Sequence, residues 1–107
     1  MGKIITYKQE GARGIFSQIK LNNGDRVLIS IAAGEIKIFK MKFLGLVPGS
    51  TIWQYPSLHK FFELTQENGY EDMPLDVLVN KVKNFDSIDQ LQRELSNFIT
   101  NLKSNKQ

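Results

Sequence analysis

Cysteine is absent from this chain of 107 residues, and histidine occurs only once, at His59. Without cysteine there is no disulfide bond, no thiol nucleophile and no thiolate ligand for a metal ion. A lone histidine also lacks the second imidazole that most histidine-based metal sites use. The lack of cysteine is typical of a reducing compartment, and no apolar run near the N-terminus has the length of a signal peptide. We therefore expect a cytoplasmic protein.

Long hydrophobic runs are absent as well. The longest apolar stretch, FLGLVPG at residues 43–49, is far shorter than the roughly 20 residues of a membrane-spanning helix, so no membrane span is expected. The composition, 41% hydrophobic and 23% charged residues, is that of an ordinary globular protein. A chain of this length usually has one core, and residues 1–107 are expected to form a single domain.

The first 55 residues show the alternation of apolar and polar side chains that is typical of β-strands. A hairpin signal, Asn-Asn-Gly at residues 22–24, separates two such segments. A three-residue loop there pairs Ile19 with Val27 and keeps the apolar side chains on one face, whereas a two-residue turn would mix the faces. The sequence therefore predicts the longer loop, with Gly24 in the left-handed conformation.

Further strands are predicted on both sides of this hairpin. The segment KIITY at residues 3–7 precedes it, and a strand after AAGE pairs Ile31 with Ile36. VPGS at residues 47–50 has the composition of a turn that leads into a last strand at residues 51–55. Five short strands leave no room for crossover helices. We therefore expect a strongly twisted antiparallel sheet, either open or closed into a small SH3-like barrel.

Beyond residue 55 the apolar residues recur at helical spacing. A first helix is expected to end at Asn68-Gly69, a second to begin at Pro74, and a third to begin after Ser87. The expected class is α+β, with a β-sheet part followed by three C-terminal helices. The corresponding ranges are 1–55 for the sheet or barrel part, 56–103 for the helical part and 104–107 for a frayed tail.

The net charge of +3 is unevenly distributed along the chain. Residues 1–60 contain nine lysines and arginines and three acidic residues, whereas residues 61–107 contain five and eight. The first part therefore carries about +6 and the second about −3 at neutral pH. This division indicates either a basic surface that meets an anionic partner or two parts that neutralise each other.

The segment GEIKIFKMKF at residues 34–43 carries three lysines among five apolar side chains. Its alternation breaks in the middle, and a β-bulge near residues 38–39 would turn all three lysines to the outer face of the sheet. The hairpin register would bring two more cations beside them. The candidate residues for binding nucleic acid or another anionic partner are Lys20, Arg26, Lys37, Lys40, Lys42 and Phe16.

Two interpretations of this basic face are open. In the first, the lysines protect a strand against edge-to-edge aggregation, or the acidic helices neutralise them. In the second, the lysines contact phosphates and Phe16 stacks on bases, as happens when small barrels hold single-stranded nucleic acid. A protein surface or an anionic lipid surface would use the same charges.

Aromatic side chains are concentrated where the predicted sheet passes into the helices, in TIWQYPSLHKFF at residues 51–62. Such a cluster most often forms the core between two layers, and it can also line a recognition groove. For the apolar stripe of the third helix, packing within the fold is the favoured explanation, and contact with a second copy or a partner helix is the alternative. The candidate protein-contact residues are Trp53, Tyr55, Phe98 and Leu102.

Signatures of catalysis are missing. The sequence contains no nucleophile elbow, no HExxH motif and no nucleotide-binding loop. His59 is interpreted as a surface residue, and the acidic residues between 71 and 76 as charges that favour a helix N-terminus. No catalytic residue, metal or cofactor is therefore predicted.

The expected function is that of a non-enzymatic intracellular binding or assembly module that uses the basic sheet face and the aromatic junction. A protein partner or a second copy of the chain is the favoured partner, and nucleic acid is the other one considered. The alternative function is that of a small β-barrel that binds single-stranded nucleic acid. A further alternative is a small hydrolase or metal-dependent enzyme that uses His59 and the acidic cluster.

Overall fold

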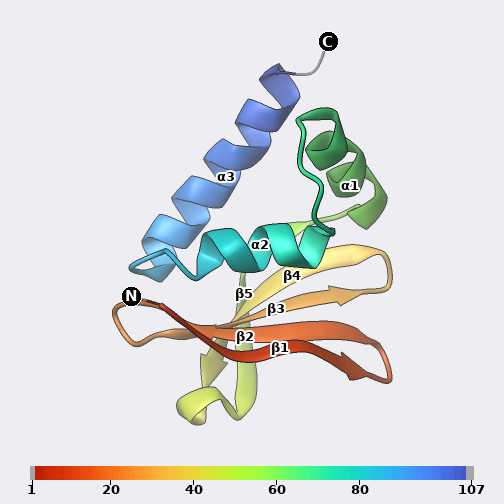
Figure 1. Ribbon diagram of the computed structural model, residues 1–107. Helices are drawn as coiled ribbons and strands as arrows, with labels where there is room; N and C mark the ends of the chain where they lie inside the picture. The colour runs from red at the N-terminus through yellow and green to blue at the C-terminus, as the bar shows by residue number, and fades with distance from the viewer. Residues whose placement is uncertain (1, 106–107) are drawn as a thin grey trace.

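The fold has two layers, a five-stranded β-sheet and three helices that cover one of its faces (Figure 1). The computed structural model describes residues 2–105. The strands are β1 (Lys3–Gly11), β2 (Gly14–Lys20), β3 (Arg26–Ala32), β4 (Glu35–Lys42) and β5 (Val47–Tyr55). A short 3₁₀ segment, η1 (Phe43–Gly45), precedes β5, and the helices are α1 (Leu58–Glu67), α2 (Pro74–Val82) and α3 (Ile88–Ser104).

The sheet is antiparallel and open, and its strands follow one another in chain order from β1 to β5. The predicted α+β class is confirmed. Of the two forms expected for the sheet, the open one is present and the small barrel is not. Helix α3 continues to Ser104, and residues 106 and 107 of the predicted frayed tail lie outside the described residues.

Both central hairpins have the predicted register. Ile19 lies opposite Val27, and Gly24 in the three-residue loop between them has a φ of +97°. β3 and β4 are joined by a tight turn at residues 33–34, where both residues have positive φ as a type I′ turn requires. In each hairpin the loop length that keeps the apolar side chains on one face is the one observed.

β4 does not contain the predicted bulge. Its pairing with β3 is continuous, and Lys40 lies opposite the buried Val27. The register with β5 does shift directly after Ile38, where the irregularity was expected, but the unpaired residue is Ile52 and belongs to β5. The position of the irregularity is confirmed, and its assignment to β4 is wrong.

The three lysines of β4 are consequently divided between the two faces of the sheet. Lys40 and Lys42 have the parity of Ile36 and Ile38, which are fully buried on the side of the helices. Lys37 has the opposite parity and points to the outer face. The prediction that all three share one face is wrong, because an extra residue in β5 leaves the alternation of β4 unchanged.

The chain reverses between β4 and β5 earlier than predicted. Residues 47–50, expected to form a turn, belong to β5, and the reversal occupies residues 43–46. The Leu46 N–H donates to the carbonyl oxygen of Lys42 over 3.1 Å and closes this loop. Pro48 is accommodated in the strand because the pairing with β4 is irregular there. The prediction of a turn at residues 47–50 is therefore wrong.

The helix boundaries follow capping residues in the sequence. Ser57 and Ser87 cap α1 and α3, and each side-chain oxygen accepts a hydrogen bond of 3.1 Å from the N–H three residues later. α2 has Pro74 in its first turn, where a missing N–H is tolerated. α1 ends before Gly69, whose φ is +88°.

The core lies between the helices and the inner face of the sheet. Of the helices, α2 lies along β2 and β3, whereas α1 and α3 are farther from the sheet (Figure 1). Within residues 2–105, none of the three α-helices covers the outer face of the sheet. The largest fully buried side chains are Phe61, Ile19, Leu21, Ile29, Ile36, Ile38, Leu78, Leu91 and Leu95.

Candidate binding surface

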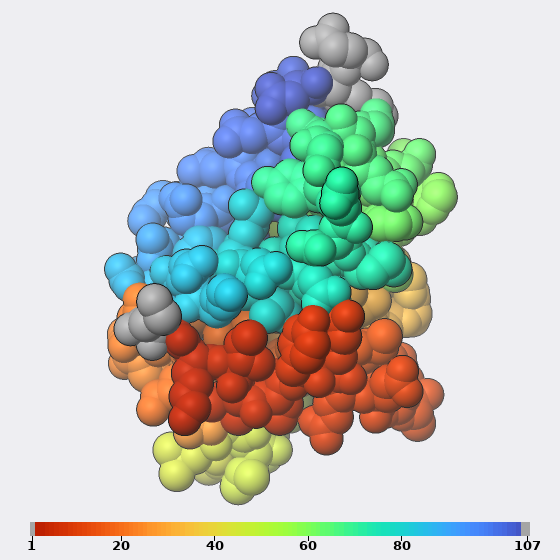
Figure 2. All heavy atoms as spheres, viewed as in Figure 1, coloured from red at the N-terminus to blue at the C-terminus, as the bar shows by residue number. Residues whose placement is uncertain are grey.

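An apolar loop protrudes from the molecule at the end of the sheet that lies away from the helices. This apolar loop consists of residues 43–46, between β4 and β5, and Figure 2 shows it projecting beyond the neighbouring strands. Phe43, Leu44 and Leu46 are 72%, 86% and 81% exposed. Single exposed apolar residues are common on protein surfaces, but a contiguous group of them marks a contact surface.

The backbone of the apolar loop is left-handed at three consecutive residues. The φ angles of Phe43, Leu44 and Gly45 are +52°, +56° and +90°. This conformation costs roughly 1–2 kcal/mol for a residue with a side chain, and glycine or asparagine usually occupies it. The sequential neighbours Phe43 and Leu44 are both exposed. Strain of this kind is concentrated at functional sites.

A row of three cationic side chains crosses the outer face at the same end of the sheet. Lys3, Lys20 and Arg26 occupy directly paired positions on β1, β2 and β3. This basic row makes no ion pair with any of residues 2–105. Like charges at directly paired positions destabilise a sheet by roughly 0.2–1 kcal/mol per pair. The fold therefore bears a repulsion that an anionic partner would relieve.

The apolar loop and the basic row are in contact. The side-chain amide of Gln18 donates a hydrogen bond of 3.1 Å to the carbonyl oxygen of Gly45. A β-carbon on Gly45 would lie 3.2 Å from Cδ of Arg26, so the stem of Arg26 lies against the loop. The stem of Lys42 lies similarly close to Gly49 at the start of β5. Cations thus flank the base of the loop.

The basic row faces away from the helical layer. Along their strands, Lys20 and Arg26 alternate with Ile19 and Val27, which are fully buried under the helices. The helices carry the acidic residues of the second part of the chain, and they lie across the sheet from the basic row. The acidic helices therefore do not neutralise the basic row.

The other predicted cations of β4 lie in different surroundings. Lys37 points to the outer face near the far end of the strand, and its Nζ is 3.9 Å from a carboxylate oxygen of Glu35. Lys40 lines a shallow pocket on the helix side together with Asp89. Neither belongs to the basic row. The structure thus groups three of the predicted cations around the apolar loop, namely Lys20, Arg26 and Lys42.

The predicted stacking residue, Phe16, does not adjoin the basic row. It lies four residues along β2 from Lys20, which is about 13 Å at the rise of a β-strand. Its ring is half-buried and packs against Gly11, where a β-carbon would come within 2.9 Å of it. Phe16 therefore offers no platform for bases beside the cations, and the exposed aromatic ring at this end of the sheet is that of Phe43.

The predicted aromatic junction is present, and most of it is internal. Trp53 stacks on Tyr55 with ring centres 6.5 Å apart, and Tyr55 meets the edge of Phe61 at 5.9 Å. Phe98 and Leu102 are only 9% and 3% exposed, so the apolar stripe of α3 packs within the fold, as favoured from the sequence. Trp53 and Tyr55 are half-buried and form the part of the cluster that is open to contact.

An apolar groove of about 560 Å³ lies at the other end of the sheet, between the sheet, α1 and α2. Its lining is mainly apolar and includes Ile15, Ile31, Phe62 and Met73. Met73 is 57% exposed. The groove is a second exposed apolar surface, separated from the apolar loop by the length of the sheet (Figure 1).

His59 lies on the exposed side of α1, at the rim of this groove. Its side chain is 83% exposed, and Nε2 is 3.2 Å from a carboxylate oxygen of Glu63, one turn later in the helix. Among residues 2–105, no group of three or more histidine, aspartate or glutamate side chains is arranged to hold a metal ion. The geometry of His59 is that of a surface ion pair.

One carboxylate ties the edge strand β1 to helix α2. The Tyr7 hydroxyl and the Lys8 ammonium group both donate to Asp76, the latter over 2.9 Å. Two adjacent side chains reach it because β1 is irregular here, with Lys8 at a φ of +49°. Hydrogen bonding to Asp76 raises the pKa of Tyr7 and of Lys8. Burial raises the pKa of Asp76, but the two hydrogen bonds outweigh it, and this pKa is lowered.

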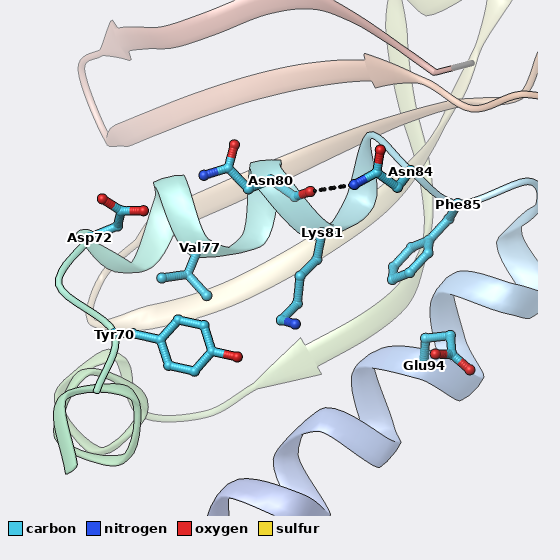
Figure 3. A pocket seen from close by; sticks show the side chains of 8 residues that line it. All are labelled: Tyr70, Asp72, Val77, Asn80, Lys81, Asn84, Phe85 and Glu94. Carbon is cyan, nitrogen blue, oxygen red and sulfur yellow. Dashed lines mark hydrogen bonds between the residues drawn. The ribbon is translucent and has the colours of Figure 1, made fainter. Parts of the chain in front are cut away.

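A cleft of about 420 Å³ separates α2 from α3. Figure 3 shows Lys81 extending from α2 into this cleft, with Glu94 on the opposite helix. The Lys81 ammonium group lies 4.1 Å from the centre of the Phe98 ring and 5.8 Å from that of Tyr70. The cation of the cleft is therefore engaged with aromatic rings of the protein itself.

Comparison with known protein families, with curated proteins and with solved structures found no match for this chain. None of the helices within residues 2–105 is long and apolar enough to cross a membrane. The loop end, which we define as the apolar loop together with the basic row, remains the most distinctive surface of the molecule. It combines the most exposed apolar side chains with cations that have no acidic partner among the described residues.

The sequence held one signal for the apolar loop. The stretch FLGLVPG at residues 43–49 breaks the strand alternation and contains no polar residue. Its proline and second glycine indicate a turn, whereas only Gly45 marks the true reversal. Lys3 was not a candidate because its pairing partner is set by bulges in β1 that the sequence does not reveal.

Proposed function

We propose that this chain is a non-enzymatic binding module that engages an anionic partner through the loop end. The observation that supports this proposal is the basic row, three paired cations with no acidic partner within residues 2–105, in contact with the apolar loop. An anionic surface laid on the row removes the repulsion among the cations and gains attraction to each of them.

Electrostatics of this kind gives rapid and salt-sensitive association. Cations on one edge of a small protein steer it towards a negative surface, and their effect weakens as salt screens them over about 10 Å. Of the residues named from the sequence, the proposal keeps Lys20, Arg26 and Lys42. It leaves out Lys37 and Lys40, which lie near acidic side chains.

Two anionic probes test this proposal, a labelled single-stranded oligodeoxynucleotide and vesicles that contain phosphatidylserine. The unmodified chain should bind at least one of them at low salt, with affinity that falls as salt is added. The double variant Lys20→Gln/Arg26→Gln should lose this binding while its circular dichroism spectrum is unchanged. If the unmodified chain binds neither probe at low salt, the proposal is refuted.

A protein partner or a second copy of the chain, the partner favoured from the sequence, is supported by a different observation. The apolar groove exposes Met73 and Ile15 beside the helices, and such surfaces are typical of protein contacts. A mass that rises with concentration, and that Met73→Ser holds at the monomer value, would support self-association. A constant monomer mass at high concentration would refute it.

The expected cytoplasmic location stays a prediction.

A further inference from the structure

We propose that the anionic partner is a lipid membrane surface, into which the apolar loop inserts while the basic row lies on the lipid phosphates. This inference rests on the proposed function and names the partner of the same loop end. It depends on the two properties that the loop end combines, apolar side chains that protrude and cations at their base.

The order of these properties matches that of a bilayer. Phe43, Leu44 and Leu46 are the most exposed apolar side chains of the described chain, whereas the stem of Arg26 lies against Gly45 and that of Lys42 against Gly49, at the base of the loop. In a membrane the phosphates lie at the surface and the acyl chains begin just below them. Lysine and arginine side chains keep their charge at the phosphates while their stems cover apolar surface. Insertion of the loop therefore brings the cations to the depth of the phosphates.

Nucleic acid is a poorer match for the same surface. It would use the cations and the exposed ring of Phe43, but the two more exposed side chains of the loop, Leu44 and Leu46, are aliphatic and offer bases no aromatic face on which to stack. The one aromatic residue predicted for stacking, Phe16, is half-buried and distant from the basic row. A small free anion would leave the apolar loop without a partner. The lipid surface is the partner that uses all three exposed apolar side chains of the loop together with the cations.

The shape of the loop also favours a fluid partner. The loop is convex and projects beyond the neighbouring strands, with left-handed backbone at Phe43, Leu44 and Gly45. A bilayer admits a protrusion of any outline, whereas a protein partner would need a pocket matched to it. Two leucines and one phenylalanine form a shallow anchor, and anchors of this size bind reversibly and depend on additional charge attraction. We therefore expect binding only to anionic membranes.

Vesicle sedimentation tests the lipid specificity. The unmodified chain should bind vesicles of phosphatidylcholine mixed with phosphatidylserine, and bind vesicles of phosphatidylcholine alone at least about tenfold more weakly. Higher salt should weaken the binding to anionic vesicles. Equal binding to both kinds of vesicle, or binding to neither, would overturn the inference.

Matched variants separate the contribution of the loop from that of charge. Leu44→Ser/Leu46→Ser should reduce binding to anionic vesicles at least about tenfold, because both side chains lose their transfer into the bilayer. Ile4→Ser removes an exposed apolar side chain from the face of the sheet opposite the basic row and should change binding less than about twofold. Unchanged binding of the double variant would overturn insertion of the loop.

The absence of cysteine allows a direct test of insertion. A single cysteine at Leu44→Cys can be labelled with an environment-sensitive dye without any competing thiol. On anionic vesicles its emission should shift to the blue, whereas the same dye at Asn101→Cys, near the end of α3 and far from the loop, should not shift. No shift at residue 44 on vesicles that bind the chain would overturn the inference.

The outcomes distinguish this inference from the proposed function. If the chain binds the oligodeoxynucleotide through Lys20 and Arg26 but does not bind anionic vesicles, the anionic-partner proposal stands and the lipid inference fails. If it binds neither probe, both fail. If vesicle binding requires both the loop leucines and the basic row, both are supported.

Discussion

The two reversals that flank β4 have similar backbones and very different side chains. The turn at Ala33-Gly34 has φ angles of +53° and +74°, and the loop at its other end has +52° and +56° at Phe43 and Leu44. The first reversal is built of small residues, and the carbonyl oxygen of Gly34 accepts a hydrogen bond of 2.8 Å from the first residue of α1. The second carries large apolar side chains that no other part of the described chain covers.

This difference shows which side chains the fold requires. Small side chains suit a tight turn against which a helix begins, and Gly34 accepts its positive φ, although Ala33 bears the same left-handed cost as Leu44. Phenylalanine and leucine are costly in left-handed conformation, and exposure gives them no packing in return. The fold explains the small side chains of the first reversal and does not explain the large ones of the second, and this is why we propose a binding role for the second.

The largest expected effect contrasts the buried and exposed parts of this region. Ile38→Ala should lower the free energy of unfolding by about 3 kcal/mol, because the side chain is fully buried and leaves a cavity. Leu44→Ala, six residues later, should change it by less than about 0.5 kcal/mol. Urea unfolding measures both values. Comparable losses in the two variants would mean that the loop is packed and not free.

A smaller effect concerns the tie between β1 and α2. Because the pKa of Asp76 is lowered in the folded state, its contribution to stability is present above the ordinary carboxyl pKa of about 4 and is lost as pH falls below it. Asp76→Asn should therefore be less stable at neutral pH and should lose less stability between pH 5 and about pH 2. Unfolding by urea over this pH range is the measurement.

The same tie predicts behaviour at alkaline pH. The raised pKa values of Tyr7 and Lys8 mean that their contribution is complete below their ordinary values, near pH 10, and is lost as pH rises above them. Tyr7→Phe should therefore weaken the alkaline loss. An unchanged profile in both the Asp76 and the Tyr7 variants would show that the tie does not form in solution.

Relief of the left-handed strain should stabilise the protein. Leu44→Asn should raise the free energy of unfolding by about 1 kcal/mol, because asparagine accepts this backbone more readily. Ala33→Asn, with a similar φ in the turn, should give a comparable gain and is the matched control. Only the Leu44 variant should also lose binding to anionic vesicles. A gain in binding for Leu44→Asn would contradict the assignment of the loop.

The smallest expected effect concerns the charges at the two ends of the sheet. Lys20→Gln should raise stability by up to about 0.5 kcal/mol at low salt, because it removes repulsion within the basic row, and high salt should abolish the gain. Lys37→Gln should lower it by less than about 0.5 kcal/mol, since it breaks a long surface ion pair with Glu35. A loss of stability in the Lys20 variant would mean that other groups neutralise the charges of the basic row, so that its cations do not repel one another.

Much of the sheet could be predicted because the alternation of apolar and polar side chains fixes how the strands pair. A pairing that mixed apolar and polar side chains on one face was excluded at both central hairpins, and the structure has the remaining registers. The helix ends were predictable for a similar reason, since Ser57, Ser87 and Gly69 satisfy orphan backbone groups or accept positive φ. These are local requirements, and single residues reveal them.

The candidate site was less predictable because it depends on neighbours. Whether an irregularity belongs to β4 or to β5 depends on both strands, and the sequence of β4 alone misplaced Lys40 and Lys42. The position of Lys3 in the basic row depends on two irregularities in β1. The exposure of Leu44 depends on the strand that follows it, which begins at Val47 and continues through a proline. None of these features can be recognised from the amino-acid composition of a single segment.

The order of the strands has a consequence for how the chain folds. Each strand pairs only with the strand before it and the strand after it, so no pairing in the sheet spans a long stretch of sequence. The entropy lost on closing such short loops is small, and hairpins of this kind form within about 1–10 μs. We expect the central hairpins to form first, the outer strands to pair with them next, and the helical layer to pack on the sheet last. A chain that leaves the ribosome N-terminus first would have all five strands available before the helices emerge.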